Sequence, residues 1–151
     1  MNTEIMSLKK ILLVEDDPRD VELTLAALKE HNLANQVAVV HDGAEALDYL
    51  YCREKFKTRA NGHPVLVLLD LKLPKVGGLE VLERLRADAR TRRLPVVILT
   101  SSNVESDLAR SYDLGANSYI RKPVDFTQFM EAVNQLGLYW LVLNESPPYA
   151  E

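Results

Sequence analysis

Residues 11–20 read ILLVEDDPRD, and this stretch decides the fold and points to the site. Four apolar, strand-forming residues end abruptly at three consecutive acids, Glu15, Asp16 and Asp17. Like charges held this close together raise the pKa of at least one of the carboxyl groups. We therefore expect a cation to lie between these acids.

Four more apolar runs follow along the chain. They are rich in Val, Ile and Leu with little polar alternation, which is typical of strands buried on both faces of a parallel sheet. The five predicted strands are Lys10–Val14, Gln36–Val40, Val65–Asp70, Pro95–Thr100 and Ser118–Ile120. Between them, apolar residues share helical faces: Val21, Leu25 and Leu28; Leu79, Leu82 and Leu85; and Phe126, Phe129, Val133 and Leu136. This alternation predicts an α/β fold, an open doubly wound sheet with helices on both faces.

Composition limits the class of protein. A chain of 151 residues is long enough for one domain with a real core, and 47% hydrophobic and 26% charged residues are ordinary for a globular protein. The net charge of −4 gives no reason to expect a nucleic-acid or anionic-membrane partner. The single cysteine, Cys52, excludes an internal disulfide and fits a reducing compartment. We see no signal-peptide pattern and no apolar run near the ~20 residues that span a bilayer, so we expect a cytoplasmic protein.

Polar side chains gather at the ends of the predicted strands. They are Glu15 and Asp16 after the first strand, Asp70 at the end of the third, Thr100 and Ser101 at the fourth, and Lys122 after the fifth. Ligands bind beyond the carboxyl ends of the strands in such sheets, so we expect these groups to converge. Clustered carboxylates suit Mg²⁺, to which we assign Glu15 and Asp16. Asp17, followed by Pro18, instead has the pattern of a helix start.

At these residues the sequence resembles the receiver domain of two-component response regulators. The matching motifs are VEDDP at 14–18, LLDLKLP at 68–74 with Gly77-Gly78 after it, ILTS at 98–101, GANSY at 115–119 and Lys122-Pro123. The resemblance covers about residues 8–136 and leaves 137–151 as a C-terminal extension. It implies a flavodoxin-like strand order of 2-1-3-4-5. It also implies transfer of a phosphoryl group from the phosphohistidine of a sensor histidine kinase to an aspartate.

The resemblance further implies the roles of the acids. Asp70 corresponds to the aspartate that accepts the phosphoryl group. Asp16 would bind Mg²⁺ directly, and Glu15 would bind it through a water molecule. Asp70 itself and the backbone carbonyl of Lys72 would complete the protein ligands.

Three other residues match the family's catalytic and switching positions. Lys122 would neutralise a phosphoryl oxygen, a charge role that dominates catalysis of phosphoryl transfer. Thr100 would donate a hydrogen bond to the phosphoryl group, and Tyr119 matches an aromatic residue that turns inward when that threonine moves. The family also implies a cis bond between Lys122 and Pro123, since X-Pro bonds tolerate the cis form.

Plainer interpretations stay open. Asp70 could cap a turn, Lys122 could be a solvated lysine, and Tyr119 could be a core residue. A phosphatase of the haloacid dehalogenase type would need a second acid where Lys72 stands, and a nucleotide-binding domain would need a glycine-rich loop after the first strand. The main alternative is a pseudo-receiver that folds and binds proteins without being phosphorylated. We interpret His31, His41, His63 and Cys52 as surface or packing residues.

The remaining sequence bears on partners. Nothing after Leu136 is long or basic enough for a DNA-binding output region, so we expect one receiver domain over residues 1–151 that signals by conformational change and protein binding. Such a protein is not an enzyme in the usual sense, although it would assist its own phosphoryl transfer and autodephosphorylation. The loop Phe56–Pro64 and the C-terminal tail resemble the response regulators that partner phytochrome kinases, which predicts a partner of that type.

Apolar residues continue beyond the predicted core. A heptad-like stripe passes through Gly137 and consists of Phe126, Phe129, Val133, Leu136, Trp140 and Leu143. Gly137 could instead end the helix. Against that, Leu138–Leu143 is apolar on every face, and such a helix must be buried. We predict that the last helix runs to about Leu143 and forms a two-fold homodimer with the surface of the fourth helix and fifth strand. Its contact residues would be Phe126, Phe129, Val133, Trp140, Leu141 and Leu143.

Overall fold

The computed structural model describes residues 10–30, 33, 36–59, 62–122 and 125–148. Their sheet has five parallel strands in the order β2-β1-β3-β4-β5, as the resemblance implied. The strands are β1 (Ile11–Val14), β2 (Val37–Val40), β3 (Leu66–Leu69), β4 (Val96–Thr100) and β5 (Ser118–Arg121). Four of them lie within the predicted runs, and β5 extends one residue beyond its run.

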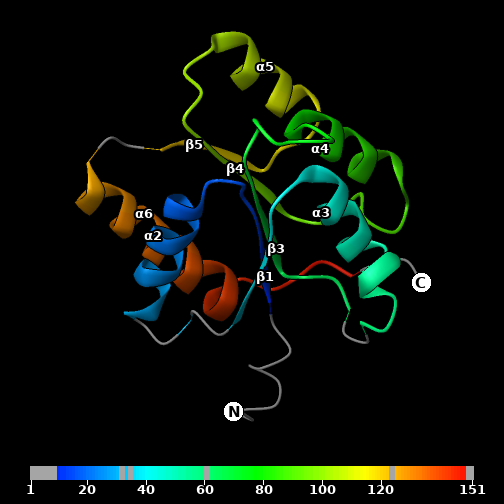
Figure 1. Cartoon of the computed structure of the whole chain (residues 1–151), viewed down its shortest axis with the longest axis horizontal. Helices are drawn as coiled ribbons and strands as arrows, with labels where there is room; N and C mark the ends of the chain where they lie inside the picture. The colour runs from blue at the N-terminus through cyan, green and yellow to red at the C-terminus, as the bar shows by residue number, and fades with distance from the viewer. Residues whose placement is uncertain (1–9, 31–32, 34–35, 60–61, 123–124, 149–151) are drawn as a thin grey trace.

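Helices cover both faces of this sheet (Figure 1). They are α2 (Pro18–Lys29), α3 (Gly43–Leu50), α4 (Gly78–Ala87), α5 (Glu105–Asp113) and α6 (Phe126–Leu138), with a short 3-10 turn η2 (Glu54–Phe56) and a π-helical turn η3 (Tyr139–Leu143). On one side α2 lies beside α6, and on the other lie α3 and α4 (Figure 1). The doubly wound architecture is therefore confirmed.

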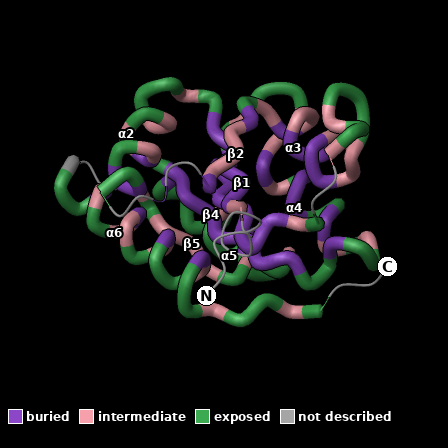
Figure 2. The backbone as a smooth tube through the Cα atoms, turned by 90° about the horizontal axis from the view of Figure 1, so that it is seen from below, coloured by how far each residue is buried: buried purple, intermediate pink, exposed green. Residues whose placement is uncertain are grey.

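The core has two layers because successive strand residues point to opposite faces. Ile11 and Leu13 pack with α2 and α6, whereas Leu12 and Val14 pack with α3 and α4. Figure 2 shows the strands as a buried centre with exposed outer turns around them. This explains why the strand sequences are apolar at every position.

Aspartates begin three of the helices. Asp17 accepts a hydrogen bond from the backbone N–H of Arg19 at 2.9 Å, and Pro18 is the first residue of α2. Asp42 caps α3, and Asp125 caps α6 in the same way. The assignment of Asp17 to the helix start is confirmed, and it leaves Glu15 and Asp16 to the end of β1.

The last helix continues past Gly137, so the alternative in which this glycine ends the helix is wrong. The π-helical turn follows α6 directly, and the backbone N–H of Asn144 donates to the carbonyl of Tyr139 at 2.7 Å. The chain leaves the helix after Leu143, as predicted. Beyond it, Arg93 donates to the carbonyl of Pro148 at 3.3 Å, which ties the tail to the loop before β4.

Part of the predicted dimer surface needs correction. Phe129, Val133 and Leu141 are buried in the chain's own core against α2 and the sheet, so they offer no surface to a partner. Trp140 is only partly exposed, and the side chain of Phe126 lies outside the described residues. The apolar residues that are exposed at this end are Leu138, Tyr139, Val142 and Leu143. Periodicity located the helix but could not separate its core face from its free face.

Among the described residues, no helix is both long and apolar enough to cross a bilayer.

Candidate functional site

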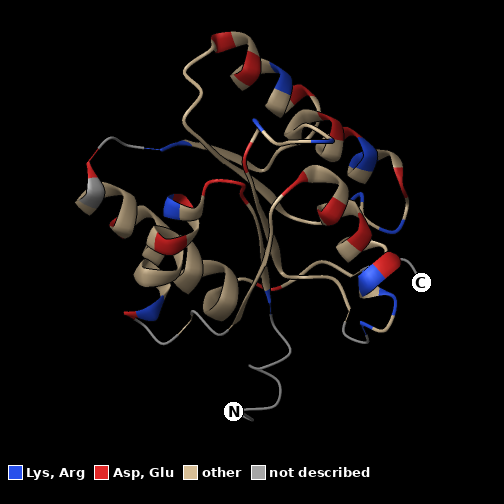
Figure 3. Cartoon of the chain, viewed as in Figure 1, with Lys and Arg blue, Asp and Glu red and all other residues tan. Residues whose placement is uncertain are grey.

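The carboxyl ends of β1, β3, β4 and β5 meet at one edge of the sheet. Figure 3 shows acidic segments after β1 and at the end of β3, and a basic segment at the end of β5. The predicted convergence of Glu15, Asp70 and Lys122 is confirmed by direct contacts between them. The central acid, Asp70, follows Leu69 at the end of β3 and is buried.

Backbone contacts fix the position of Asp70. Its own N–H donates to the carbonyl of Val14 at 3.1 Å, and its Oδ1 accepts from the N–H of Leu71 at 2.7 Å and of Lys72 at 3.4 Å. The start of α4 presses on the same segment, since a Cβ on Gly78 would lie 2.2 Å from the carbonyl oxygen of Asp70. Only glycine fits at position 78, which explains one of the two glycines that follow the loop 71–76, whereas a Cβ on Gly77 would have room.

Lys122 is the cation among the acids. Its ammonium donates to Oε1 of Glu15, to Oδ2 of Asp20 at 2.7 Å and to Oδ2 of Asp70 at 3.2 Å. The side chain is only 8% exposed. Burial alone would lower the pKa of Lys122, but the hydrogen bonds to Asp20 and Glu15 outweigh it and the pKa is raised. Lys122 is therefore a fixed charge of the site and not a solvated surface lysine.

Asp20 was missed by the sequence reasoning. It lies in the first turn of α2, where an acid is common simply because it suits the positive end of the helix dipole. A weak signal was present, since Asp17 and Pro18 mark a helix start directly after β1 and Asp20 lies in the first turn of that helix. Acids are common in first turns, so this did not single Asp20 out.

The two buried acids differ in proton affinity. Burial raises the pKa of Glu15 to about 7, and the charge of Asp70 adds to this while Lys122 opposes it. Burial also acts to raise the pKa of Asp70, but the charge of Lys122 and a hydrogen bond from Thr100 outweigh it and the pKa is lowered. Glu15 is therefore the first of the two to take up a proton as the pH falls. A raised pKa was expected within the acidic run and is found at Glu15, but its causes are burial first and the charge of Asp70 second, and not the two neighbouring acids of the run.

Oxygen atoms of Glu15, Asp16 and Asp70 fit a metal site. One oxygen from each lies within 4.8 Å of the others, and Asp16 is the exposed member. Opposite ligands of Mg²⁺ are about 4.2 Å apart, because each Mg–O distance is about 2.1 Å. Oxygens that all lie within 4.8 Å of one another are close enough to be ligands of one such ion, either directly or through a bridging water. The role of the Lys72 carbonyl stays a prediction.

A hydroxyl network lies beneath the site on the β4 side. Thr100 is fully buried, and its Oγ1 accepts from the N–H of Ser102 at 3.3 Å. Ser102 donates through Oγ to Asp107 on α5 at 2.7 Å, and its carbonyl accepts from the hydroxyl of Tyr119 at 3.2 Å. Ser102 therefore joins Thr100, Tyr119 and α5. Ser101, which is also predicted at this strand end, is exposed, whereas Thr100 and Ser102 share one side of an extended chain and are buried.

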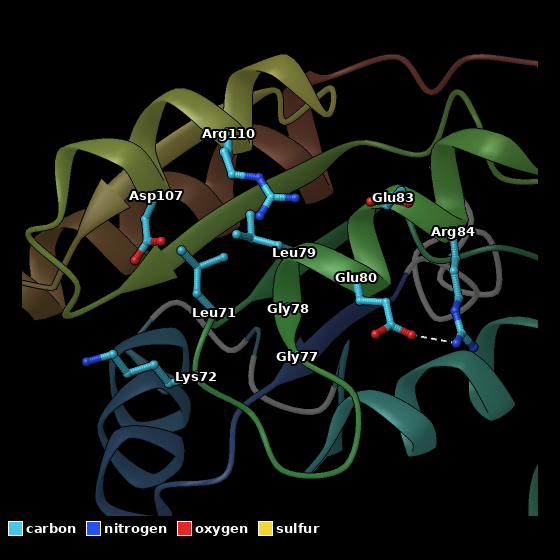
Figure 4. A pocket seen from close by; sticks show the side chains of 10 residues that line it. All are labelled: Leu71, Lys72, Gly77, Gly78, Leu79, Glu80, Glu83, Arg84, Asp107 and Arg110. Atoms are coloured by element: carbon cyan, nitrogen blue, oxygen red, sulfur yellow. Dashed lines mark hydrogen bonds and ion pairs between the residues drawn. The ribbon is translucent and has the colours of Figure 1, made fainter.

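A pocket borders this network on the side of α4 and α5. The pocket, of about 730 Å³, lies between α4 and α5, where Leu71 and Lys72 form one wall and Asp107 and Arg110 another (Figure 4). It opens beside the loop after Asp70 and does not include Asp70 or Lys122 among its lining residues. The predicted cis bond between Lys122 and Pro123 lies outside the described residues.

Comparison with known proteins agrees with this geometry. The family model for the response regulator receiver domain matches residues 11–134. Response regulator Rcp1 of Synechocystis is 34% identical over 141 residues, which are 93% of this chain and 95% of Rcp1. Its Mn²⁺-bound crystal structure superposes with a TM-score of 0.84, covering 93% of this chain and 99% of that one.

Two solved structures extend the comparison. The phosphorylated cyanobacterial phytochrome response regulator RcpA has a TM-score of 0.85 at 38% identity, covering 93% of this chain and 99% of that one. The bacteriophytochrome response regulator RtBRR is 58% identical with a TM-score of 0.73, covering 93% of this chain and 84% of its own.

Proposed function

Because the chain belongs to the response regulator receiver domain family, we propose that Asp70 accepts a phosphoryl group from the phosphohistidine of a sensor histidine kinase in the presence of Mg²⁺. The observation that carries the proposal is the position of the Asp70 carboxylate. It shares an oxygen cluster with Glu15 and Asp16 and accepts a hydrogen bond from Lys122. The family is one of signalling proteins and not of classical enzymes.

The proposed transfer uses these groups as follows. A carboxylate oxygen of Asp70 attacks phosphorus in line, and the bond from phosphorus to the histidine nitrogen breaks as the new P–O bond forms. Asp70 suits this because its lowered pKa keeps the carboxylate ionised at neutral pH. Bound Mg²⁺ supplies positive charge to the oxygens of the transferring group. The ammonium of Lys122 compensates charge on the same group, and water attack on the product would later remove the phosphoryl group.

The hydroxyl network supports a conformational signal. We propose that Thr100 turns its hydroxyl toward the phosphoryl group and so releases the N–H of Ser102. Because Ser102 also contacts Tyr119 and Asp107, the change would pass to β5 and α5. A protein that docks on α5 or β5 would then bind the two states with different affinity.

Two further parts of the proposal concern partners. The likeness to RcpA and RtBRR supports a phytochrome-type kinase. Exposed apolar residues support a homodimer: Leu138, Tyr139, Val142 and Leu143 at the end of the last helix, and Val104, Leu108 and Tyr112 along the α5 side. A cytoplasmic location belongs to the same proposal, because a phosphohistidine donor is made from ATP.

Phosphoryl uptake tests the core of the proposal. The purified chain is incubated with acetyl phosphate and Mg²⁺ and analysed on phosphate-affinity gels. We expect a shifted band that is lost with EDTA and in Asp70→Asn, and retained in Asp88→Asn, which removes a partly buried acid at the end of α4 that pairs with Arg90. Absence of a shift in the wild type at any Mg²⁺ concentration would favour the pseudo-receiver. Phosphotransfer from purified histidine kinases, including phytochromes, identifies the donor.

A further inference from the structure

Asp20 holds the ammonium of Lys122 from outside the metal cluster. Its Oδ2 lies 2.7 Å from Nζ of Lys122, a shorter contact than the 3.2 Å between Lys122 and Asp70. Asp20 is not one of the three acids whose oxygens cluster for a metal. Its contact with Lys122 therefore has to be explained by something other than metal binding.

All three N–H bonds of the ammonium are used. A lysine ammonium has three donors and no acceptor, and here the donors point to Glu15, Asp20 and Asp70. A phosphoryl oxygen can bind Lys122 only if one of these carboxylates gives up its hydrogen bond. Phosphorylation must therefore break a contact of the resting site.

Asp20 is the partner that can be released at least cost. Glu15 is 2% exposed, so it cannot leave the ammonium for water. The contact with Asp70 can pass to one oxygen of the phosphoryl group that Asp70 itself carries, and a second phosphoryl oxygen can reach the ammonium only in place of Asp20. The Asp20 side chain is 26% exposed and lies in the first turn of α2, where the helix dipole stabilises a free carboxylate. Release of Asp20 leaves the metal cluster unchanged.

The net charge of the site also indicates that Asp20 is the contact to be released. Four carboxylates against one ammonium and one divalent cation leave the site with one negative charge in excess. A phosphoryl group adds further negative charge, and like charges at short range repel strongly when they are partly shielded from water. Asp20 is the acid that neither accepts the phosphoryl group nor joins the metal cluster. Its charge therefore disfavours the phosphorylated state.

We propose that Asp20 is a positioning residue that holds Lys122 in a resting position and thereby opposes phosphorylation of Asp70. This inference rests on the proposed function. It differs from a purely structural role, in which Asp20 would only stabilise the start of α2. Asp17 provides the comparison, because it is an acid of the same helix start whose described contacts do not include Lys122.

The test compares Asp20→Asn, Asp20→Glu and the matched control Asp17→Asn in the full chain. Binding of beryllofluoride, an analogue of the phosphoryl group, is measured by calorimetry in saturating Mg²⁺. The rate of phosphorylation by acetyl phosphate is measured on phosphate-affinity gels. We expect Asp20→Asn to bind beryllofluoride on the order of tenfold more tightly than the wild type and to phosphorylate faster, since one nearby negative charge is removed. The gain should shrink in high salt.

The controls separate positioning from helix stability. Asp17→Asn removes the same charge from the same helix end, and its affinity for beryllofluoride should stay near that of the wild type. Asp20→Glu keeps the negative charge, so its affinity should also be close to that of the wild type. Equal or weaker beryllofluoride binding in Asp20→Asn, with a wild type that binds, would overturn this inference alone. So would an equal gain in Asp17→Asn. A wild type that neither binds beryllofluoride nor takes up phosphate would overturn the proposed function, and this inference with it.

Discussion

Gly137 on α6 packs directly onto the side chain of Leu28 on α2. A Cβ at position 137 would lie 2.4 Å from Cδ2 of Leu28 and 3.3 Å from Cδ1 of Leu33. Leu28 is fully buried, so its methyl groups cannot turn aside into water. The glycine is thus a place of close helix contact and not a helix end.

Gly137→Ala should therefore destabilise the protein. Helix propensity alone would favour alanine by about 1 kcal/mol, but forcing a methyl group into a packed core costs about 1–3 kcal/mol. We expect a net loss of about 1 kcal/mol in the free energy of urea unfolding. The same change in a Leu28→Ala background, where space has been opened, should be neutral or stabilising. If the single variant Gly137→Ala, with Leu28 unchanged, were more stable than the wild type, the close contact between Gly137 and Leu28 would be contradicted.

The fate of Gly137 shows what the sequence could and could not predict about the fold. Strand order and helix positions follow from local patterns, because buried strands and amphipathic helices have distinct periods. Whether a glycine ends a helix or lets two helices touch depends on a residue 109 positions away, Leu28. The same limit applies to Leu141, which is apolar like Val142 beside it yet is buried.

Metal binding should release protons near neutral pH. Because the pKa of Glu15 is raised to about 7, its carboxyl group must lose a proton before it can serve the metal site. We expect Mg²⁺ affinity to rise by about tenfold from pH 6 to pH 8 and then to level off. Calorimetry at pH 7 in two buffers of different ionisation enthalpy should show release of about half a proton per Mg²⁺. In Glu15→Gln both the pH dependence and the proton release should be lost, and their persistence would assign them to another group.

Removal of the Lys122 charge should reveal the repulsion among the acids. Removing one partner of a buried ion pair costs about 3–5 kcal/mol of stability. We therefore expect the free energy of unfolding of Lys122→Met to be lower than that of the wild type by up to this amount at pH 8 without metal. A folded-state pKa above the unfolded value means that protonation favours the folded form, so the Glu15 contribution is lost as the pH rises toward 7 and beyond. The loss in Lys122→Met should therefore be smaller at pH 6.

Mg²⁺ and a conservative variant complete this test. The variant Lys122→Met should bind Mg²⁺ more tightly than the wild type, because the ammonium no longer competes for Glu15 and Asp70, and Mg²⁺ should restore much of its stability. Lys122→Arg keeps the charge and should keep most of the stability without metal. Urea unfolding with and without Mg²⁺ measures both effects. If the free energy of unfolding of Lys122→Met without metal equalled that of the wild type at pH 8, the ion pairs of Lys122 would not stabilise the fold.

The site was predictable where chemistry required a residue at a strand end. Glu15, Asp70 and Lys122 follow strands directly, and parallel strands bring their carboxyl ends to one edge. Asp20 and Ser102 reach the same place by the geometry of a helix turn and a loop, which the sequence does not specify. Both are linked to predicted residues by side-chain contacts, Asp20 to Lys122 and Ser102 to Thr100.

The exposed end of the last helix should govern self-association. Leu143 is 71% exposed and Val142 is 50% exposed, whereas Leu141, which directly precedes them in the chain, is fully buried in the core. Removing the chain after Gly137 would delete Leu141 from the core, and loss of a buried leucine costs about 2–5 kcal/mol. In a protein shortened after Gly137, loss of the dimer could therefore not be told apart from loss of the fold. Charged substitutions at exposed positions avoid this problem.

We expect the double variant Val142→Glu, Leu143→Glu to be a folded monomer that still takes up phosphate at Asp70. Each carboxylate would have to be desolvated in an apolar interface, which is strongly unfavourable without a partner. The matched control is Thr127→Glu, an exposed position near the start of the same helix, and it should leave self-association unchanged. Sedimentation velocity over a range of concentrations measures the mass, with and without beryllofluoride. A wild-type chain that stays monomeric at high concentration in both conditions would rule the homodimer out, and a dimer that survives the double variant would place the interface elsewhere, on the α5 side.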